Sequence, residues 1–276
     1  MHRLCYTVRM ETQQLLPLSV QDFGILREGN YLYVDKTALM HKLVTTQRGV
    51  FLSRPRRFGK SLLLSTLKQY FLGNRDLFRG LAVEALEARR EKPWTTHPVL
   101  YFDFNGQDYT QPAALGNVMD NLFSKWEAEF GVTAKDNTLG TRFENIIIAA
   151  YEKTGERVVV LVDEYDKSLL ETMTVHPDIE EANRALFKGV FGVLKKADAY
   201  LRFYMFTGVT KFSKVSIFSD LNQLSDISLS ADFAELCGIT QAELESAFAP
   251  WIETLAQKMQ LTTADCLEEL QRLYDG

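Results

Sequence analysis

The stretch GVFLSRPRRFGKSL at residues 49–62 decides the fold. It begins as an apolar run typical of a buried strand, continues as a basic loop, and ends where Gly59-Lys60-Ser61 opens an apolar helix. This is the order of a phosphate-binding loop, in which backbone N–H groups and the helix N-terminus face phosphate oxygens. In such a loop the lysine reaches the β- and γ-phosphates and the serine hydroxyl holds Mg²⁺. The stretch therefore predicts a site for a nucleoside triphosphate, with Lys60 and Ser61 in these roles.

The first glycine of the usual phosphate-loop pattern is missing. Arg54 occupies its position, and because Arg54 precedes Pro55 we expect strand geometry to continue through it. The loop is strongly basic in a chain of formal net charge −5, so a solvated basic turn or a nucleic-acid contact is an alternative interpretation. The candidates for nucleotide binding are Arg54, Pro55, Arg56, Arg57, Phe58, Gly59, Lys60, Ser61 and Leu62.

A second motif, RVVVLVDEYDK at residues 157–167, favours the nucleotide interpretation. Its β-branched run is typical of a strand buried on both faces of a parallel sheet. Acids directly after such a strand lie at the carboxyl edge of the sheet, where doubly wound folds bind ligands. We expect Asp163 to hold the Mg²⁺ shell and Glu164 to polarise a water for attack on the γ-phosphate. Either motif alone has a structural explanation, but the two together in this order predict a nucleotide site.

Several blocks of the sequence resemble the predicted AAA-ATPase-like family of bacterial P-loop proteins. The matching blocks are LPLSVQDF (16–23), YLYVDKT (31–37), FLSRPRRFGKSLLLSTL (51–67), VVVLVDEYDK (158–167), FTGVTKFSKVSIFSDLNQLSDIS (206–228) and ELCGIT (235–240). The family carries arginine in place of the first loop glycine, which accounts for Arg54. The resemblance implies an additional-strand P-loop ATPase that uses ATP and Mg²⁺. In the family, a nuclease-like domain of the PD-(D/E)XK type often follows the ATPase domain.

Composition fits an intracellular globular enzyme, with 46% apolar and 24% charged residues. The apolar runs are too short to span a bilayer, and the N-terminus has no apolar core of signal-peptide length. Cys5, Cys237 and Cys266 show no metal-ligand spacing, which suits a reducing compartment. We therefore expect a cytoplasmic protein that does not contact membranes.

Apolar periodicity predicts alternating strands and helices. We expect strands at 50–53, 99–104, 158–162 and 201–207, a short β-like stretch at 31–34, and helices at 38–46, 60–72, 75–90, 112–130, 139–154 and 178–196. This alternation predicts an α/β fold with a parallel sheet flanked by helices, of the additional-strand, AAA-like P-loop type. A capping box at Thr240 predicts that a small helical lid begins there. The expected domains are an N-terminal extension (1–15), the ATPase domain (16–239) and the start of the lid (240–276).

Further polar residues are expected at the same sheet edge. Thr207 ends the strand expected beside 158–162, a position suited to a polar sensor of the γ-phosphate, and Thr210 competes for this role. Residues expected either near the nucleotide or in structural contacts are Asp35, Lys36, Asp103, Asn105, Lys211 and Lys214. We expect Tyr165 and Asp166 to position the acid-bearing loop. The predicted catalytic set is therefore Glu164, Lys60 and Thr207.

Three classes of function fit these motifs. The first is an ATPase that converts hydrolysis into a conformational change, with nucleic acid as a candidate partner. The second is a nucleotide-binding switch with negligible turnover, and the third is a small-molecule kinase. GTP is disfavoured because the sequence lacks an N-K-x-D guanine-reading motif.

The last residues carry a prediction of their own. Tyr274, Asp275 and Gly276 match a family block that normally leads into more lid and a nuclease-like domain. An apolar face with Leu267, Leu270 and Leu273 would then lack full cover. We expect the ATPase portion of a longer pattern, without nuclease activity of its own, that associates with a second copy or with a nuclease-like domain in cis or in trans.

Overall fold

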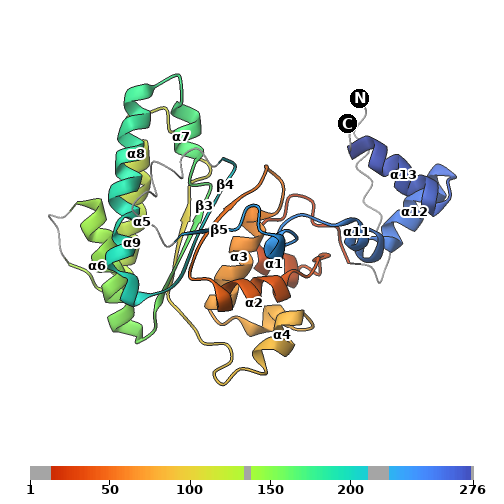
Figure 1. Ribbon diagram of the computed structural model, residues 1–276, viewed down its shortest axis with the longest axis horizontal. Helices are drawn as coiled ribbons and strands as arrows, with labels where there is room; N and C mark the ends of the chain where they lie inside the picture. The colour runs from red at the N-terminus through yellow and green to blue at the C-terminus, as the bar shows by residue number, and fades with distance from the viewer. Residues whose placement is uncertain (1–13, 134–137, 211–223, 275–276) are drawn as a thin grey trace.

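A five-stranded, all-parallel sheet forms the centre of the molecule in the computed structural model, which describes residues 14–133, 138–210 and 224–274 (Figure 1). The strands are β1 (Gly49–Ser53), β2 (Val99–Asp103), β3 (Val158–Asp163), β4 (Leu201–Gly208) and β5 (Ser225–Asp226). Their order in the sheet is β2-β3-β4-β1-β5. The predicted parallel α/β sheet is confirmed.

Strand β4 lies between β1 and β3 and so is the additional strand that the family resemblance implies. Leu52 of β1 pairs with Thr207 of β4, and Val162 of β3 pairs with Phe206. The carboxyl ends of β1, β4 and β3 therefore meet at one edge of the sheet. All residues of β1 and β3 are buried, because helices cover both faces of the sheet.

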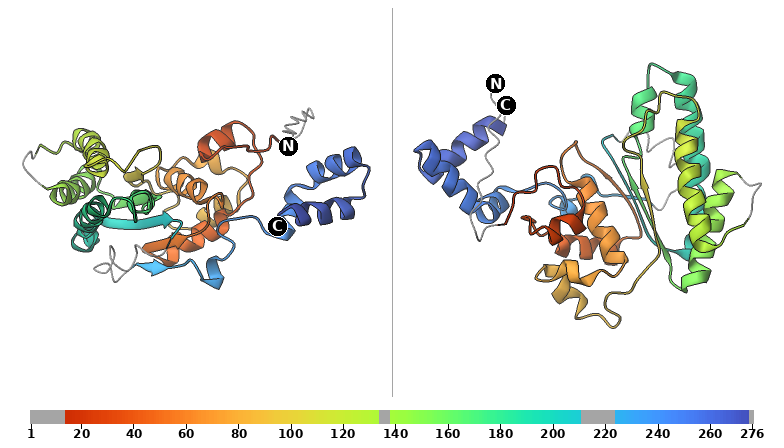
Figure 2. Two further views of the ribbon diagram at one scale, coloured as in Figure 1. Left: turned by 90° about the horizontal axis from the view of Figure 1, so that it is seen from above. Right: turned by 180° about the vertical axis from the view of Figure 1, so that it is seen from behind.

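Helices form a layer on each face of the sheet (Figures 1 and 2). One layer contains α1 (Phe23–Glu28), α2 (Thr37–Thr46), α3 (Lys60–Phe71) and α4 (Ala82–Glu87). The other contains α5 (Ala114–Phe130), α6 (Leu139–Thr154), α8 (Pro177–Phe191) and α9 (Val193–Lys196), with α7 (Lys167–Thr172) at its upper end in Figure 1. An aromatic cluster fills the second interface, where the ring of Phe102 on β2 lies 5.3 Å from that of Phe143 and 5.2 Å from that of Phe191.

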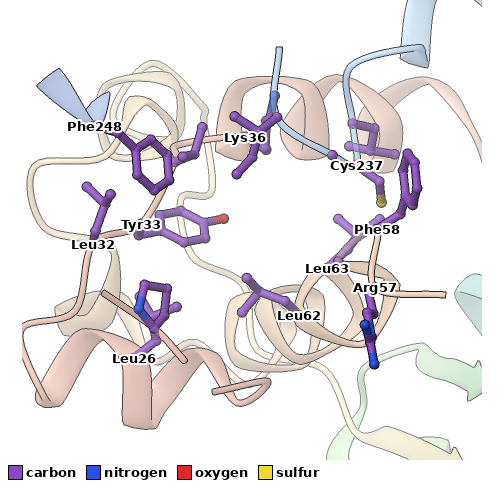
Figure 3. A pocket seen from close by; sticks show the side chains of 16 residues that line it. Leu26, Leu32, Tyr33, Lys36, Arg57, Phe58, Leu62, Leu63, Cys237 and Phe248 are labelled. Atoms are coloured by element: carbon purple, nitrogen blue, oxygen red, sulfur yellow. The ribbon is translucent and has the colours of Figure 1, made fainter. Parts of the chain in front are cut away.

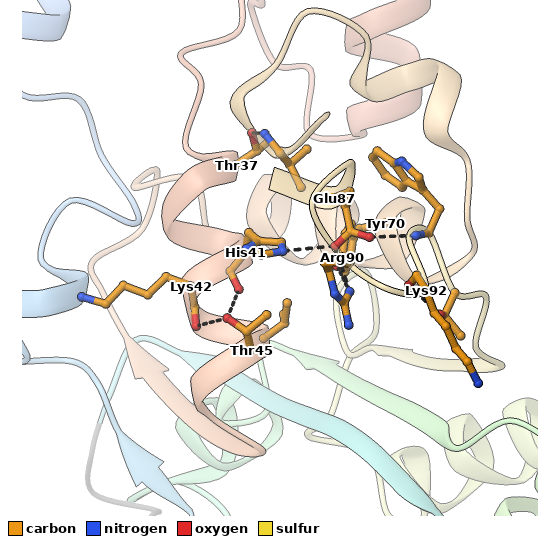
Figure 4. Close-up of polar contacts among 12 residues, drawn as sticks. Thr37, His41, Lys42, Thr45, Tyr70, Glu87, Arg90 and Lys92 are labelled. Atoms are coloured by element: carbon orange, nitrogen blue, oxygen red, sulfur yellow. Dashed lines mark hydrogen bonds and ion pairs between the residues drawn. The ribbon is translucent and has the colours of Figure 1, made fainter. Parts of the chain in front are cut away.

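A buried carboxylate holds α4 against α2 and α3 (Figure 4). Glu87 has no exposed surface, and its Oε1 lies 3.1 Å from Nε2 of His41, 2.6 Å from the Tyr70 hydroxyl and 2.9 Å from Nη1 of Arg90. Its Oε2 accepts from the backbone N–H of Trp94 at 2.7 Å. The hydrogen bonds hold the pKa of Glu87 below its usual value even though burial opposes this. This network stabilises the segment that leads from α3 to β2.

Three helices follow the sheet: α11 (Gln241–Ala247), α12 (Ala249–Met259) and α13 (Thr263–Tyr274). They lie beyond the α1–α4 layer in the views of Figures 1 and 2. The predicted capping box is present, with the Thr240 hydroxyl accepting from the N–H of Glu243 and the Glu243 carboxylate accepting from the N–H of Thr240. Leu267 and Leu270 pack against a small core of α12 and α13 but are only partly buried, and Leu273 is 63% exposed. The apolar face of α13 is thus covered only in part.

Other expectations about single elements also differ from the structure. The helix expected at 75–90 is a 3₁₀ helix (Arg75–Phe78) followed by α4, and the helix expected at 178–196 is divided into α8 and α9. The β-like stretch expected at 31–34 makes only an isolated bridge between Leu15 and Tyr31. In the described ranges, no helix combines the length and apolar character needed to cross a membrane.

Candidate nucleotide-binding site

The loop between β1 and α3 extends the pairing with β4 by one residue. The N–H of Arg54 donates to the carbonyl of Gly208 at 3.2 Å, which agrees with the extended geometry predicted for a residue before proline. The guanidinium of Arg54 donates to the carbonyl of Ser228, after β5, and lies 3.3 Å from the carbonyl of Ser53. Arg54 therefore anchors the loop to the end of β5.

The rest of the loop presents free backbone donors. Two residues have left-handed backbone conformations, Arg57 with φ 68° and Gly59 with φ 84°. A Cβ at Gly59 would meet no atom within 4 Å, so the backbone angle is what favours glycine there. Within the described residues, no hydrogen bond uses the N–H groups of residues 56–59. Four consecutive unpaired donors before a helix N-terminus form an anion-binding concavity.

Lys60 is the first residue of α3 and is only 5% exposed. Its ammonium turns back toward the loop and donates to the carbonyls of Arg54 and Pro55, each at 3.0 Å. The positive charge therefore lies beside the free N–H groups of the loop. An anion bound there would contact both the N–H groups of the loop and the Lys60 ammonium.

Asp163 ends β3 and is 1% exposed. Its Oδ1 accepts from the Thr207 hydroxyl at 2.7 Å and from the N–H of Glu164 at 3.0 Å. In the part of the chain that the structure describes, neither Oδ2 of Asp163 nor the Ser61 hydroxyl takes part in a hydrogen bond. Two oxygens of the kind that Mg²⁺ prefers thus have no hydrogen-bond partner in that part of the chain.

Glu164 follows in a left-handed conformation with φ 48° and is half-buried. Burial raises the pKa of its carboxyl, the neighbouring Asp163 raises it further, and Lys167, Lys60 and Arg56 oppose the rise. The influence of Lys60 and Arg56 places the Glu164 carboxylate within electrostatic range of the loop. A carboxyl with a raised pKa is a better base near neutral pH.

The sequence left open whether Thr207 or Thr210 is the polar sensor, and the structure gives their hydroxyls different partners. Thr207 is fully buried at the end of β4 and reaches Asp163. The Thr210 hydroxyl donates to Oδ2 of Asp166 at 2.9 Å instead. Asp103 pairs with Asp163 in the sheet register but is exposed, and it accepts from the N–H of Asn105. Lys211 and Lys214 lie outside the described residues.

A family model described as Predicted AAA-ATPase matches residues 17–218. The chain belongs to this predicted AAA-ATPase family. An uncharacterized protein in the vnfD 5′ region of Azotobacter chroococcum mcd 1 is 42% identical over 267 residues, which cover 96% of this chain and 49% of that protein. The chain thus spans about half the length of the curated relative that it matches. No solved structure matches it significantly.

The sheet domain of this predicted AAA-ATPase also carries an apolar pocket of about 180 Å³ beside the phosphate loop (Figure 3). It lies between the segment before α2, the start of α3 and the connection into α11. Its lining residues are Pro17, Leu26, Leu32, Tyr33, Val34, Lys36, Arg57, Phe58, Gly59, Leu62, Leu63, Leu236, Cys237, Gly238, Ile239 and Phe248. Among them is no Asp, Glu, Asn or Gln side chain.

Two contacts tie the C-terminal helices of the predicted AAA-ATPase to this pocket. The Lys36 ammonium forms the salt bridge that was one of its two expected roles, 2.5 and 2.6 Å from the Glu243 carboxylate oxygens, and Lys36 also lines the pocket. The N–H of Gly238 donates to the carbonyl of Phe58 at 3.0 Å. Asp35, in contrast, is structural, because it accepts from the N–H groups of Thr37 and Ala82.

Sequence reasoning found the loop and the acids but missed most of the pocket. Leu26, Leu236, Cys237 and Phe248 had no local pattern that marks a binding surface. The one available signal was the recurrence of the YLYVDKT and ELCGIT blocks in the predicted AAA-ATPase family. Both blocks contribute lining residues.

Proposed function

We propose that this protein binds ATP with Mg²⁺ at the loop after β1 and hydrolyses it to drive a conformational change. The observation that carries the proposal is the meeting of three strand ends at one edge. The loop with its free N–H groups and Lys60 follows β1, while Thr207 and Asp163 end β4 and β3 and are hydrogen-bonded to each other. This combination of donors, ammonium and carboxylates suits a triphosphate with its metal.

In this proposal the loop N–H groups and Lys60 bind the β- and γ-phosphates. Ser61 and Asp163 hold Mg²⁺, since their uncommitted oxygens are hard ligands, and phosphate oxygens and water complete the shell. When bound, Mg²⁺ neutralises charge that develops on the phosphates.

Glu164 is the proposed general base. It directly follows Asp163 at the end of β3, and its raised pKa makes it a better acceptor for the proton of an attacking water. Thr207 is the proposed sensor of the γ-phosphate. Its hydroxyl, which donates to Asp163, can donate to a γ-phosphate oxygen instead. Lys60 then neutralises the transferring phosphoryl group.

The pocket beside the loop is the proposed base site. Its apolar lining, with Leu62 and Phe58 next to the loop and Phe248 opposite, suits the faces of a purine. A guanine would bring donors at N1 and N2 to a wall without carboxylate or amide side chains, whereas an adenine brings donors only at N6, so adenine leaves fewer costly unpaired donors. ATP is therefore the proposed nucleotide.

Calorimetry and turnover assays with the whole chain test the proposal. Wild type should bind MgATP, and Lys60→Ala should weaken binding at least a hundredfold, whereas Lys68→Ala at the other end of α3 should not. Glu164→Gln should bind ATP yet lose hydrolysis. Turnover is measured alone and with DNA or RNA added.

Each failure has its own meaning. Unchanged ATP affinity in a folded Lys60→Ala variant would reject the binding site. Binding without turnover under all conditions would favour the switch, and turnover that depends on a small-molecule acceptor would favour the kinase.

A further inference from the structure

A buried carboxylate outside the proposed catalytic set joins the two loops of the site. Asp166, three residues after the end of β3, is 1% exposed. Its Oδ2 accepts three hydrogen bonds from the segment after β4: from the N–H of Val209 at 2.9 Å, and from the N–H and hydroxyl of Thr210 at 2.7 and 2.9 Å. The acid-bearing turn and the end of the sensor strand therefore share one anchor.

The neighbouring Tyr165 holds the same segment from the other side. Its N–H donates to the carbonyl of Thr207 at 3.1 Å, and its hydroxyl donates to the carbonyl of Thr210 at 2.9 Å. Between these contacts lies Gly208, where a Cβ would come within 2.5 Å of the Tyr165 ring and 2.7 Å of Oδ1 of Asp166. No residue larger than glycine fits without moving the two loops apart.

A single oxygen carries this contact. All three groups at Oδ2 of Asp166 donate to it, so the three hydrogen bonds depend on one acceptor. No Lys, Arg or His of the described chain lies within ion-pair distance of Asp166, so its charge is balanced by hydrogen bonds alone. A buried charge without a cation is costly, and a neutral packing contact would join two loops at lower cost.

We infer that Asp166 is a positioning residue: it locks residues 208–210 to the turn at 164–166 and so holds Glu164 and Thr207 as one rigid unit facing the phosphate loop. The inference rests on the proposed hydrolysis. Glu164, which has a left-handed backbone, lies between Asp163 and the clamped residues, so the clamp also fixes its strained conformation. Displacement of catalytic groups by about 1 Å costs on the order of a hundredfold in rate.

Two independent substitutions break the clamp. Asp166→Ala removes the acceptor of all three hydrogen bonds, and Gly208→Ala forces a methyl group against Tyr165 and Asp166. Both should lower kcat roughly 30- to 100-fold and leave the Kd for MgATP within about threefold. The matched control is Glu87→Gln, which alters another buried, hydrogen-bonded carboxylate far from the loop. Its kcat should equal that of the wild type at temperatures where the protein is folded.

The contrast between kcat and Kd separates positioning from mere support of the fold. Asp166→Ala leaves Lys60 and the loop after β1 unchanged, so the Kd for MgATP should stay near the wild-type value while kcat falls. In Glu87→Gln neither quantity should change.

The outcomes decide between the claims. Wild type that turns over ATP, together with folded Asp166→Ala and Gly208→Ala variants of unchanged kcat, would overturn the inference alone. Wild type without turnover would overturn the proposed hydrolysis and this inference with it. If both variants unfold, Tyr165→Phe decides, because it removes only the hydroxyl bond to Thr210. A several-fold loss of kcat supports the inference, and an unchanged kcat rejects it.

Discussion

Replacing Thr207 with valine tests the link between the sensor strand and the metal-site carboxylate. Valine matches the shape of threonine, so the substitution removes the hydroxyl and leaves the packing in place. The lost bond joins Oγ1 to Oδ1 of Asp163 at 2.7 Å, and both residues are almost fully buried. Hydrogen bonds to charged groups contribute about 1.5–3 kcal/mol to stability. We expect Thr207→Val to lower the free energy of unfolding by about 2 kcal/mol, and kcat to fall at least tenfold.

Thr172→Val is the matched control for this experiment. Thr172 is also fully buried, but its hydroxyl donates to the backbone carbonyl of Ser168 inside α7, at 2.8 Å. Loss of a neutral bond of this kind costs about 0.5–1.5 kcal/mol, and kcat should not change. Urea unfolding of the nucleotide-free protein at pH 7 compares the two variants, with turnover measured in parallel. Equal losses of stability would refute the charged-bond argument, and full turnover in Thr207→Val would refute the sensor role.

Three other predictions concern stability and the base pocket. Glu87→Ala should lower the free energy of unfolding by about 3–5 kcal/mol, since it leaves Arg90 and Tyr70 without their buried acceptor; a loss under 1 kcal/mol in urea titrations would contradict this. Burial lowers the pKa of His41, so the unfolded chain binds the proton first and stability should fall as the pH drops below about 6.5. Thermal unfolding measured over this pH range should show a shallower decline of stability in His41→Gln than in the wild type. Phe248→Ala should weaken ATP binding roughly tenfold through lost apolar contact, with no change in affinity for inorganic tripolyphosphate.

The elements nearest the phosphate loop could be predicted because their signals are local. The apolar run before Arg54 and the β-branched run before Asp163 each mark a strand buried on both faces, and both are present. The capping box at Thr240 is likewise set by residues three positions apart. The order of these elements also predicted that the loop after β1 and the acids after β3 lie at the same edge of the sheet.

The apolar pocket beside the loop could not be predicted, because it is formed by residues far apart in the sequence. Lys36 finds its partner Glu243 only when the C-terminal helices pack beside the segment before α2. The two-residue strand β5 has no periodicity of its own and is defined by its pairing with β1. The stretch at 31–34 is the opposite case. Its residues are typical of a strand, but among the described residues it makes only one bridge, between Leu15 and Tyr31.

The strand order also bears on how the chain is synthesised. β1 is the first strand of the sheet to leave a ribosome, yet its sheet neighbours β4 and β5 lie at residues 201–208 and 225–226. At roughly 5–20 residues per second, β1 and its loop wait on the order of ten seconds for these neighbours. During that interval a strand with the apolar run Val50-Phe51-Leu52 is unpaired, which is the state that chaperones recognise. A ligand that binds only the finished loop can stabilise the completed sheet but cannot assist these early steps.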